Sequence, residues 1–178
     1  IKLTFKTWYN LDPGFDFVSL MVREDGSNKW VPVKGNITTT EVDQWIKDNE
    51  KPDEWLIRNP GHAISFASKD VAGADKNGWV DAEFDLSQFK GKKVQLGFRL
   101  KTDTNTPEDG MYIDDLKVTA NNNVIFEDNA EGESKFDFEG FSKSDCVDRE
   151  NQYYMLEWRN SKNGLVDKGL KTINIGYP

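Results

Sequence analysis

The sequence is built from short runs in which apolar and polar residues alternate, with turn residues between the runs. One run carries an apolar residue at every second position: Val80, Ala82, Phe84 and Leu86. A later run repeats the pattern: Val94, Leu96, Phe98 and Leu100. Because successive side chains of a strand point to opposite faces of a sheet, this period predicts strands with one buried face. Further strands are expected at 3–9, 15–23, 29–33, 111–119 and 124–126.

Many short strands separated by frequent turns predict an all-β jelly roll, which is an antiparallel β-sandwich. We assign residues 1–120 to this sandwich and residues 121–178 to a β-rich C-terminal extension that ends abruptly. Residues 36–62 are polar and charged, and we predict an insertion or long loop there. Inside this stretch, residues 41–49 have the apolar spacing of a short helix.

The charge balance limits the classes of function. The net charge is −8 at pH 7, from 23 basic and 31 acidic residues. Nucleic-acid binding requires a basic surface, so we expect no nucleic-acid partner, and an anionic membrane surface is also disfavoured. No segment has the length and apolarity of a membrane span. Aromatic residues make up 12% of the chain, which is enough to fill a core and argues against disorder.

The usual catalytic motifs are absent from the sequence. His62 is the one histidine, so the zinc-binding motif H-E-x-x-H cannot form and we expect no zinc in this chain. Cys146 is the one cysteine; it excludes an internal disulfide and lies between acidic residues that disfavour a reactive thiolate. The cysteine usage is compatible with an exported bacterial protein and with a cytosolic one. Carboxylates are abundant, which keeps a glycosidase as a third hypothesis.

Residues 113–118 form the most informative motif, Ile-Asp-Asp-Leu-Lys-Val. Simple alternation puts Asp114 on the same face as Leu116, unless a bulge shifts the register between the two aspartates. A carboxylate on a buried face is costly unless it binds a cation, an Arg or Lys side chain, or backbone N–H groups, and all three solutions stay open. Carboxylate oxygens suit calcium. The candidate ligands of a structural Ca²⁺ are Asp16, Asp114, Asp115, Asp128 and Glu131.

Two tryptophans in the 36–62 stretch are candidates for ligand binding. Trp45 and Trp55 stand apart as large aromatic residues in a polar segment. Exposed aromatic rings in the loops of a β-sandwich can stack on sugar rings. The alternative, which we favour, is that both rings cover the flank of the sandwich as a small second core.

Several motifs together resemble a known family. The N-terminal ones are LTFKTWY at 3–9, NPGH at 59–62, WVDAEFDL at 79–86 and IDDLKV at 113–118. These resemble a MAM-like jelly roll, although such strand motifs are weakly specific. The later motifs are DNAEG at 128–132, YYMLEWR at 153–159 and DKGL at 167–170. The combination is more specific and resembles the immune inhibitor A-type secreted bacterial metallopeptidases.

The resemblance implies that the chain is a non-catalytic MAM-like domain with its following segment, from a secreted precursor whose zinc-binding helix lies outside this sequence. It also implies an adjacent catalytic domain as the main partner and bound Ca²⁺ in the parent protein. The expected role is to stabilise or orient the protease, or to help bind protein substrates or surfaces. The alternative is a carbohydrate- or cell-surface-binding module of an extracellular protein. The insertion at 41–58 departs from the family pattern.

Overall fold

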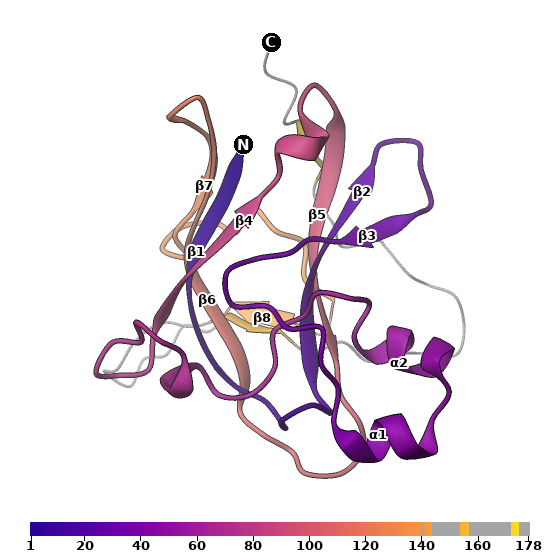
Figure 1. Ribbon diagram of the computed structural model, residues 1–178. Helices are drawn as coiled ribbons and strands as arrows, with labels where there is room; N and C mark the ends of the chain where they lie inside the picture. The colour runs from indigo at the N-terminus through magenta and orange to yellow at the C-terminus, as the bar shows by residue number, and fades with distance from the viewer. Residues whose placement is uncertain (140, 144–153, 157–171, 175–178) are drawn as a thin grey trace.

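A computed structural model describes residues 1–139 and 141–143, together with the backbone of 154–156 and 172–174. Two antiparallel four-stranded sheets face each other (Figure 1), which confirms the predicted all-β sandwich. The strands are β1 (Lys2–Asn10), β2 (Phe17–Glu24), β3 (Trp30–Pro32), β4 (Val80–Asp85), β5 (Lys93–Lys101), β6 (Gly110–Ala120), β7 (Asn123–Asp128), β8 (Phe141–Lys143), β9 (Tyr154–Leu156) and β10 (Thr172–Asn174). The helices are α1 (Gln44–Asn49), α2 (Pro52–Arg58), and the short 3-10 turns η1 (Ser68–Asp70) and η2 (Ser87–Phe89).

The first sheet has the strand order β4-β1-β6-β7. Its inner face buries the alternate apolar residues of β4 as the sequence predicts, and Phe84 is 0% exposed. Its outer face carries ion pairs between neighbouring strands: Lys2 Nζ lies 2.6 Å from Glu83 Oε1, and Lys6 Nζ lies 2.6 Å from Asp81 Oδ1. These pairs are exposed and contribute little stability. The outer face of β4 is therefore a solvated, charged surface.

The second sheet has the order β10-β5-β2-β3. Val18, Leu20 and Val22 point from β2 into the sandwich, and each is 0% exposed. Phe17, which directly precedes Val18, points to the opposite face of this sheet and is also fully buried, because another layer covers it. Both faces of β2 are thus packed at this end, which explains its nearly continuous apolar sequence.

Aromatic rings join the two sheets across the core. The rings of Phe5 and Phe84 stack with centroids 5.7 Å apart, and Phe98 of the second sheet meets Phe5 edge-on at 5.2 Å. Gly35 lies directly against the Phe84 ring, where a Cβ atom would come within 2.6 Å of it. The 33–36 segment therefore closes this side of the core only because residue 35 has no side chain.

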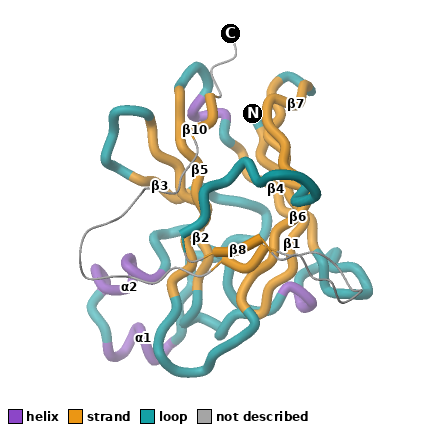
Figure 2. The backbone as a smooth tube through the Cα atoms, turned by 180° about the vertical axis from the view of Figure 1, so that it is seen from behind, coloured by secondary structure: helices purple, strands orange, loops and turns teal. Residues whose placement is uncertain are grey.

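Residues 36–62 form a separate layer beside the second sheet. They contain α1 and α2, which lie together at one end of the sandwich (Figures 1 and 2). Helix α1 confirms the short helix expected from the sequence. Ile46 of this helix is 0% exposed and packs with Val42, Ala63 and the outward-facing Phe17. The predicted insertion is thus a small helical layer with its own apolar cluster.

Two of the strands beyond residue 120 are paired with the sandwich. Strand β7 hydrogen-bonds to β6 in the first sheet, and β10 pairs with β5 at the edge of the second. The boundary predicted at residue 120 therefore falls within a sheet. Strands β8 and β9 form a separate two-stranded sheet. Phe136, Phe138, Tyr154, Leu156 and Trp158 in the C-terminal extension also predict strands; the backbone at Phe136 and Phe138 is not in a strand, β9 contains Tyr154 and Leu156, and Cys146 and Trp158 lie outside the described residues.

Candidate functional site

A β-bulge separates the two aspartates of the IDD motif. In the pairing with β1, Asp114 lies opposite Lys6, and the register then shifts so that Lys117 lies opposite Thr4. Asp115 has a φ of 51°, a left-handed conformation that is uncommon for residues other than glycine. Ile113 and Leu116, both buried, can therefore share the inner face. Of the alternatives that the sequence leaves open, the bulge is the one that the structure confirms.

Four of the predicted calcium ligands lie near one another. Burial raises the pKa of Asp114 above its ordinary value, and the nearby carboxylates of Asp115, Glu131 and Asp128 raise it further. The backbone N–H of Asp115 donates to Asp114 Oδ1 at 2.7 Å and partly offsets this effect. Negative charge is thus concentrated around Asp114, at the junction of β6 and the loop after β7.

Two of these carboxylates already have backbone partners. Asp128 is 7% exposed; its Oδ1 accepts a hydrogen bond from Ala130 N at 3.0 Å and its Oδ2 one from Lys135 N at 2.7 Å. Asp128 therefore organises the turn that follows β7. The carboxylate oxygens are the donors that calcium prefers, but within residues 1–139 and 141–143 no three His, Cys, Asp or Glu side chains converge as a metal site. The donor chemistry fits calcium, although the carboxylates of the described residues do not converge into a coordination sphere.

Asp16 belongs to a different cluster of carboxylates. It is 5% exposed at the end of the β1–β2 loop, where its Oδ1 accepts a hydrogen bond from Asp103 N at 3.2 Å. Burial raises the pKa of Asp16 to about 6, and the charges of Asp103 and Asp12 add to the effect. The pKa of Asp12 is also raised, by burial first and then by Asp103, Glu108 and Asp43. The sequence analysis missed this grouping because its members come from three separate loops.

The two tryptophans have different environments. Trp55 is half-buried, and its Nε1 donates to the carbonyl oxygens of Ile46 and Glu50 at 3.1 and 3.0 Å. Trp55 therefore joins α1 to α2, as expected for a residue of a small second core. Trp45 is 57% exposed and touches Phe15, with ring centroids 6.4 Å apart. Only Trp45 presents its ring to solvent.

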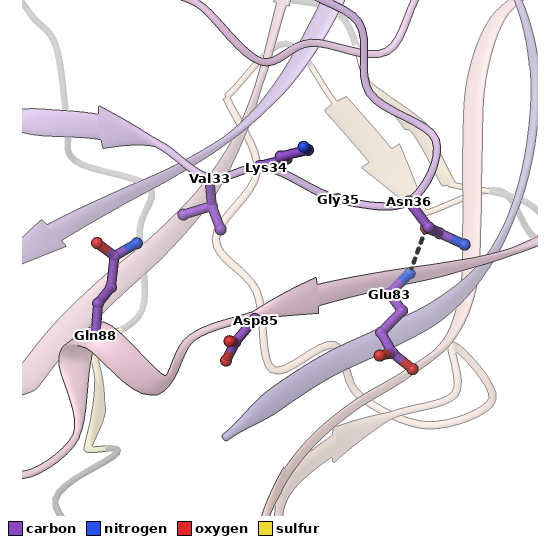
Figure 3. A pocket seen from close by; sticks show the side chains of 7 residues that line it. All are labelled: Val33, Lys34, Gly35, Asn36, Glu83, Asp85 and Gln88. Atoms are coloured by element: carbon purple, nitrogen blue, oxygen red, sulfur yellow. Dashed lines mark hydrogen bonds between the residues drawn. The ribbon is translucent and has the colours of Figure 1, made fainter.

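A shallow depression of about 640 Å³ lies along the edge of β4 (Figure 3). Its lining is Val33, Lys34, Gly35, Asn36, Glu83, Asp85 and Gln88. Asn36 behaves as a strand residue here: its Oδ1 accepts from Glu83 N at 2.8 Å and its Nδ2 donates to Asp81 O at 2.8 Å. These two bonds satisfy the backbone carbonyl of Asp81 and the backbone N–H of Glu83 on the edge strand β4. The two carboxylates also have other partners, because Glu83 pairs with Lys2 and Asp85 accepts a hydrogen bond from Ser87 N at 2.8 Å.

No helix in the described part of the chain has the length and apolarity needed to cross a membrane.

Comparisons with known proteins relate the chain to bacterial protease precursors. It is 35% identical over 171 residues to the pre-pro-metalloprotease PrtV of Vibrio cholerae serotype O1, which covers 96% of this chain and 16% of PrtV. It is 31% identical over 160 residues to immune inhibitor A of Bacillus thuringiensis subsp. alesti, covering 89% of this chain and 19% of that protein. Bacillopeptidase F of Bacillus subtilis is 25% identical over 117 residues, or 66% of this chain and 6% of that protein.

The chain thus spans less than a fifth of the length of each of these relatives. The sequence model of the family described as "Immune inhibitor A-like, MAM domain" matches residues 1–146. This match includes strands β1 to β8 and the whole of the α1–α2 layer, whereas β10, the edge strand of the second sheet, lies outside it. The chain therefore belongs to the immune inhibitor A-like MAM domain family.

Proposed function

We propose that this chain is a non-catalytic accessory domain of a secreted metalloprotease precursor, and that it stabilises or orients the protease or helps it to bind substrates or surfaces. The observation that carries the proposal is the match of nearly the whole chain to a small part of two precursors: 96% of the chain aligns with 16% of PrtV, and 89% with 19% of immune inhibitor A. The remainder of each relative has room for catalytic domains.

The structure supports a mechanical role for the sandwich. Its two sheets are joined by stacked aromatic rings, and the outer face of β4 is neutralised by ion pairs with β1. A packed sandwich of this kind holds its surface loops in fixed positions. An accessory domain can in this way present a binding surface at a fixed place relative to a neighbouring domain.

The test uses the natural precursor with and without this domain. We expect removal of residues 1–146 to reduce the yield of soluble, active protease while peptide hydrolysis by the correctly folded fraction changes less. A precursor in which another β-sandwich of similar length replaces the domain is the control for spacing. Unchanged yield and unchanged cleavage of both peptide and protein substrates would contradict the proposal.

We further propose that a Ca²⁺ ion binds at the bulge, through Asp114, Asp115 and Glu131. The support is electrostatic: burial and three neighbouring carboxylates raise the pKa of Asp114, and a cation would relieve the repulsion. Calcium should therefore raise the melting temperature relative to EDTA, and Asp115→Asn should remove most of that increase. Asp53→Asn, which removes an exposed carboxylate from α2, serves as the control. An equal melting temperature in calcium and EDTA would refute calcium binding.

A further inference from the structure

Exposed apolar side chains are concentrated in one segment of the molecule. Five large apolar side chains in the described residues are strongly exposed: Trp45, Leu56, Ile57, Phe66 and Val124. All but Val124 belong to the stretch that carries α1, α2 and the connection back to the sandwich. A folded domain seldom leaves large apolar groups together on its surface unless they contact a partner.

Two of these side chains flank the β1–β2 loop. Trp45 touches Phe15 of this loop, and Asp43 N donates to Gly14 O at 3.0 Å. Leu11 N also donates to Phe66 O at 3.0 Å, and Gly14 N donates to the hydroxyl of Ser65. Each of the two segments that hydrogen-bond to the loop therefore carries an exposed aromatic residue. Phe66, with a φ of 74°, is held in a left-handed conformation, and its side chain is 45% exposed.

Carboxylates surround the same loop, and none of them is in an ion pair. The acidic groups are Asp12, Asp16, Asp43, Asp103 and Glu108, and none of them forms a salt bridge within the described residues. Arg58 attracts Asp103 and Asp16 but forms its ion pair with Glu50, at 2.6 Å. Asp16 is buried, so the name loop-end surface is used for the aromatic rings of Phe15, Trp45 and Phe66 together with the other four carboxylates.

We propose that the loop-end surface binds an extended, arginine- or lysine-rich peptide segment of a protein partner. A basic side chain matches both of its features: the aliphatic stem and guanidinium or ammonium group pack on an aromatic ring, while the charge neutralises the carboxylates. Arginine suits it best, because the planar guanidinium stacks on tryptophan and can bridge two carboxylate oxygens.

Other ligands would interact with either the aromatic rings or the carboxylates of the loop-end surface, but not with both. A neutral sugar would use the rings but leave the carboxylate repulsion in place. A calcium ion would use the carboxylates but leave the exposed rings without a contact. The proposal concerns binding by this chain itself and does not depend on its attachment to a protease.

The test measures binding of a fluorescein-labelled oligo-arginine peptide to the full 178-residue chain by fluorescence anisotropy. Trp45→Ala should weaken binding about three- to five-fold, the size of an exposed cation–π contact. The double variant Asp12→Asn/Glu108→Gln should weaken it about ten-fold at low salt, and by less at about 0.15 M salt because of screening. The matched controls are Val124→Ala, another exposed apolar residue, and Glu127→Gln/Glu133→Gln, which removes two charges near β7.

The proposal holds if both loop-end variants weaken binding and both controls bind like the native chain. Absence of peptide binding overturns it. Equal weakening by Glu127→Gln/Glu133→Gln shows that only the net charge attracts the peptide, and this also overturns it. Displacement of the peptide by chitin or cellulose oligosaccharides assigns the surface to glycans instead. Complete displacement by calcium, lost in the Asp12→Asn/Glu108→Gln variant, assigns it to a metal ion. Circular dichroism and the melting temperature of each variant confirm that it is folded.

Discussion

The two apolar clusters of this molecule differ in size and in how they are enclosed. The main core lies between two sheets and receives alternate side chains from both, so that Phe84 and Val18 are fully buried from opposite sides. The second cluster has one sheet face below it and two short helices above, and only four residues in it are buried: Phe17, Val42, Ile46 and Ala63. The same helical layer leaves Trp45, Leu56 and Ile57 exposed.

This difference indicates that the sandwich and the α1–α2 layer have different roles. The sandwich has the burial expected of a stable scaffold, whereas the α1–α2 layer has a small core and an apolar surface facing solvent. Segments with few buried apolar contacts open at lower free energy than the rest of a fold, and binding surfaces are often found in such segments. If this difference in roles is correct, core substitutions in the two clusters should differ in both the size and the extent of their effects.

The largest effect is expected for Phe84→Ala in the main core. The ring is 0% exposed, stacks on Phe5 and packs against Gly35, so its loss creates a cavity that the rigid sheets cannot close. We expect a loss of about 4 kcal/mol in the free energy of unfolding. Urea denaturation monitored by tryptophan fluorescence measures it. A loss below about 1 kcal/mol would show that the sandwich core is not the dominant source of stability.

The second prediction concerns Asp16, which precedes β2 where the two clusters meet. Its pKa is about 6 in the fold, against an ordinary value of 3.8, so the folded protein binds the proton more tightly than the unfolded chain does. The charged side chain therefore costs stability as the pH rises from about 4 through 6, by up to about 3 kcal/mol above that range. Asp16→Asn should stabilise the protein at pH 7.5 and have little effect near pH 4.

The measurement is the free energy of unfolding of both proteins across this pH range. The difference in the free energy of unfolding between the wild-type protein and Asp16→Asn reports on Asp16 alone, because both proteins share all other carboxylates. Several of those carboxylates have lowered pKa values and therefore add stability as the pH rises. A difference that does not vary with pH would contradict the raised pKa. A wild-type protein more stable than Asp16→Asn at pH 7.5 would indicate that a cation compensates the charge.

Ile46→Ala tests the second cluster and should have a smaller effect. Ile46 is 0% exposed, but its cluster is small and its helices can settle onto the sheet, so we expect about 2 kcal/mol, the lower end of the range for such truncations. The loss should be local. Hydrogen exchange should accelerate in α1 and α2 while β1, β2 and β6 keep their protection. Uniform acceleration throughout the sandwich would mean that the two clusters unfold as one unit.

The sandwich was largely predictable from the sequence, whereas the surface clusters were not. The period-two rows of β4 and β5 face the core as expected, with Phe98 partly and the other members fully buried, because a sheet with one covered face imposes that pattern directly. The bulge at Asp115 was also foreseen as an alternative, since simple alternation placed a carboxylate inside. Strand order was not visible in the pattern, so the pairing of β7 with β6 across residue 120 was missed.

The strand order also determines which candidate site residues lie close together in the fold. The charges of Asp115, Asp128 and Glu131 act on Asp114, because a strand and the loop after its neighbour are close in sequence, and the role of these residues as calcium ligands stays a prediction. Asp16 was placed with them, but it lies with Asp12 and Asp103 instead, at a loop end whose members are about ninety residues apart in the chain. Phe66 gave no signal at all, because its exposure follows from a left-handed backbone conformation that its sequence does not indicate.

The smallest effect on the free energy of unfolding is expected for Trp45→Ala. This variant tests directly whether the exposed side chains of the helical layer contribute to stability. Large buried aromatic residues cost about 3–5 kcal/mol when truncated, but Trp45 is 57% exposed and its one ring contact is with Phe15. We expect a change below about 0.5 kcal/mol in the free energy of unfolding, as for other surface substitutions. Trp55→Ala is the matched control in the same layer: its ring is half-buried and its Nε1 bonds both Ile46 O and Glu50 O, so it should cost clearly more. Urea denaturation of both variants decides the point. A large loss for Trp45→Ala would mean that this ring holds the helices in place, and its exposure would then be no argument for a partner.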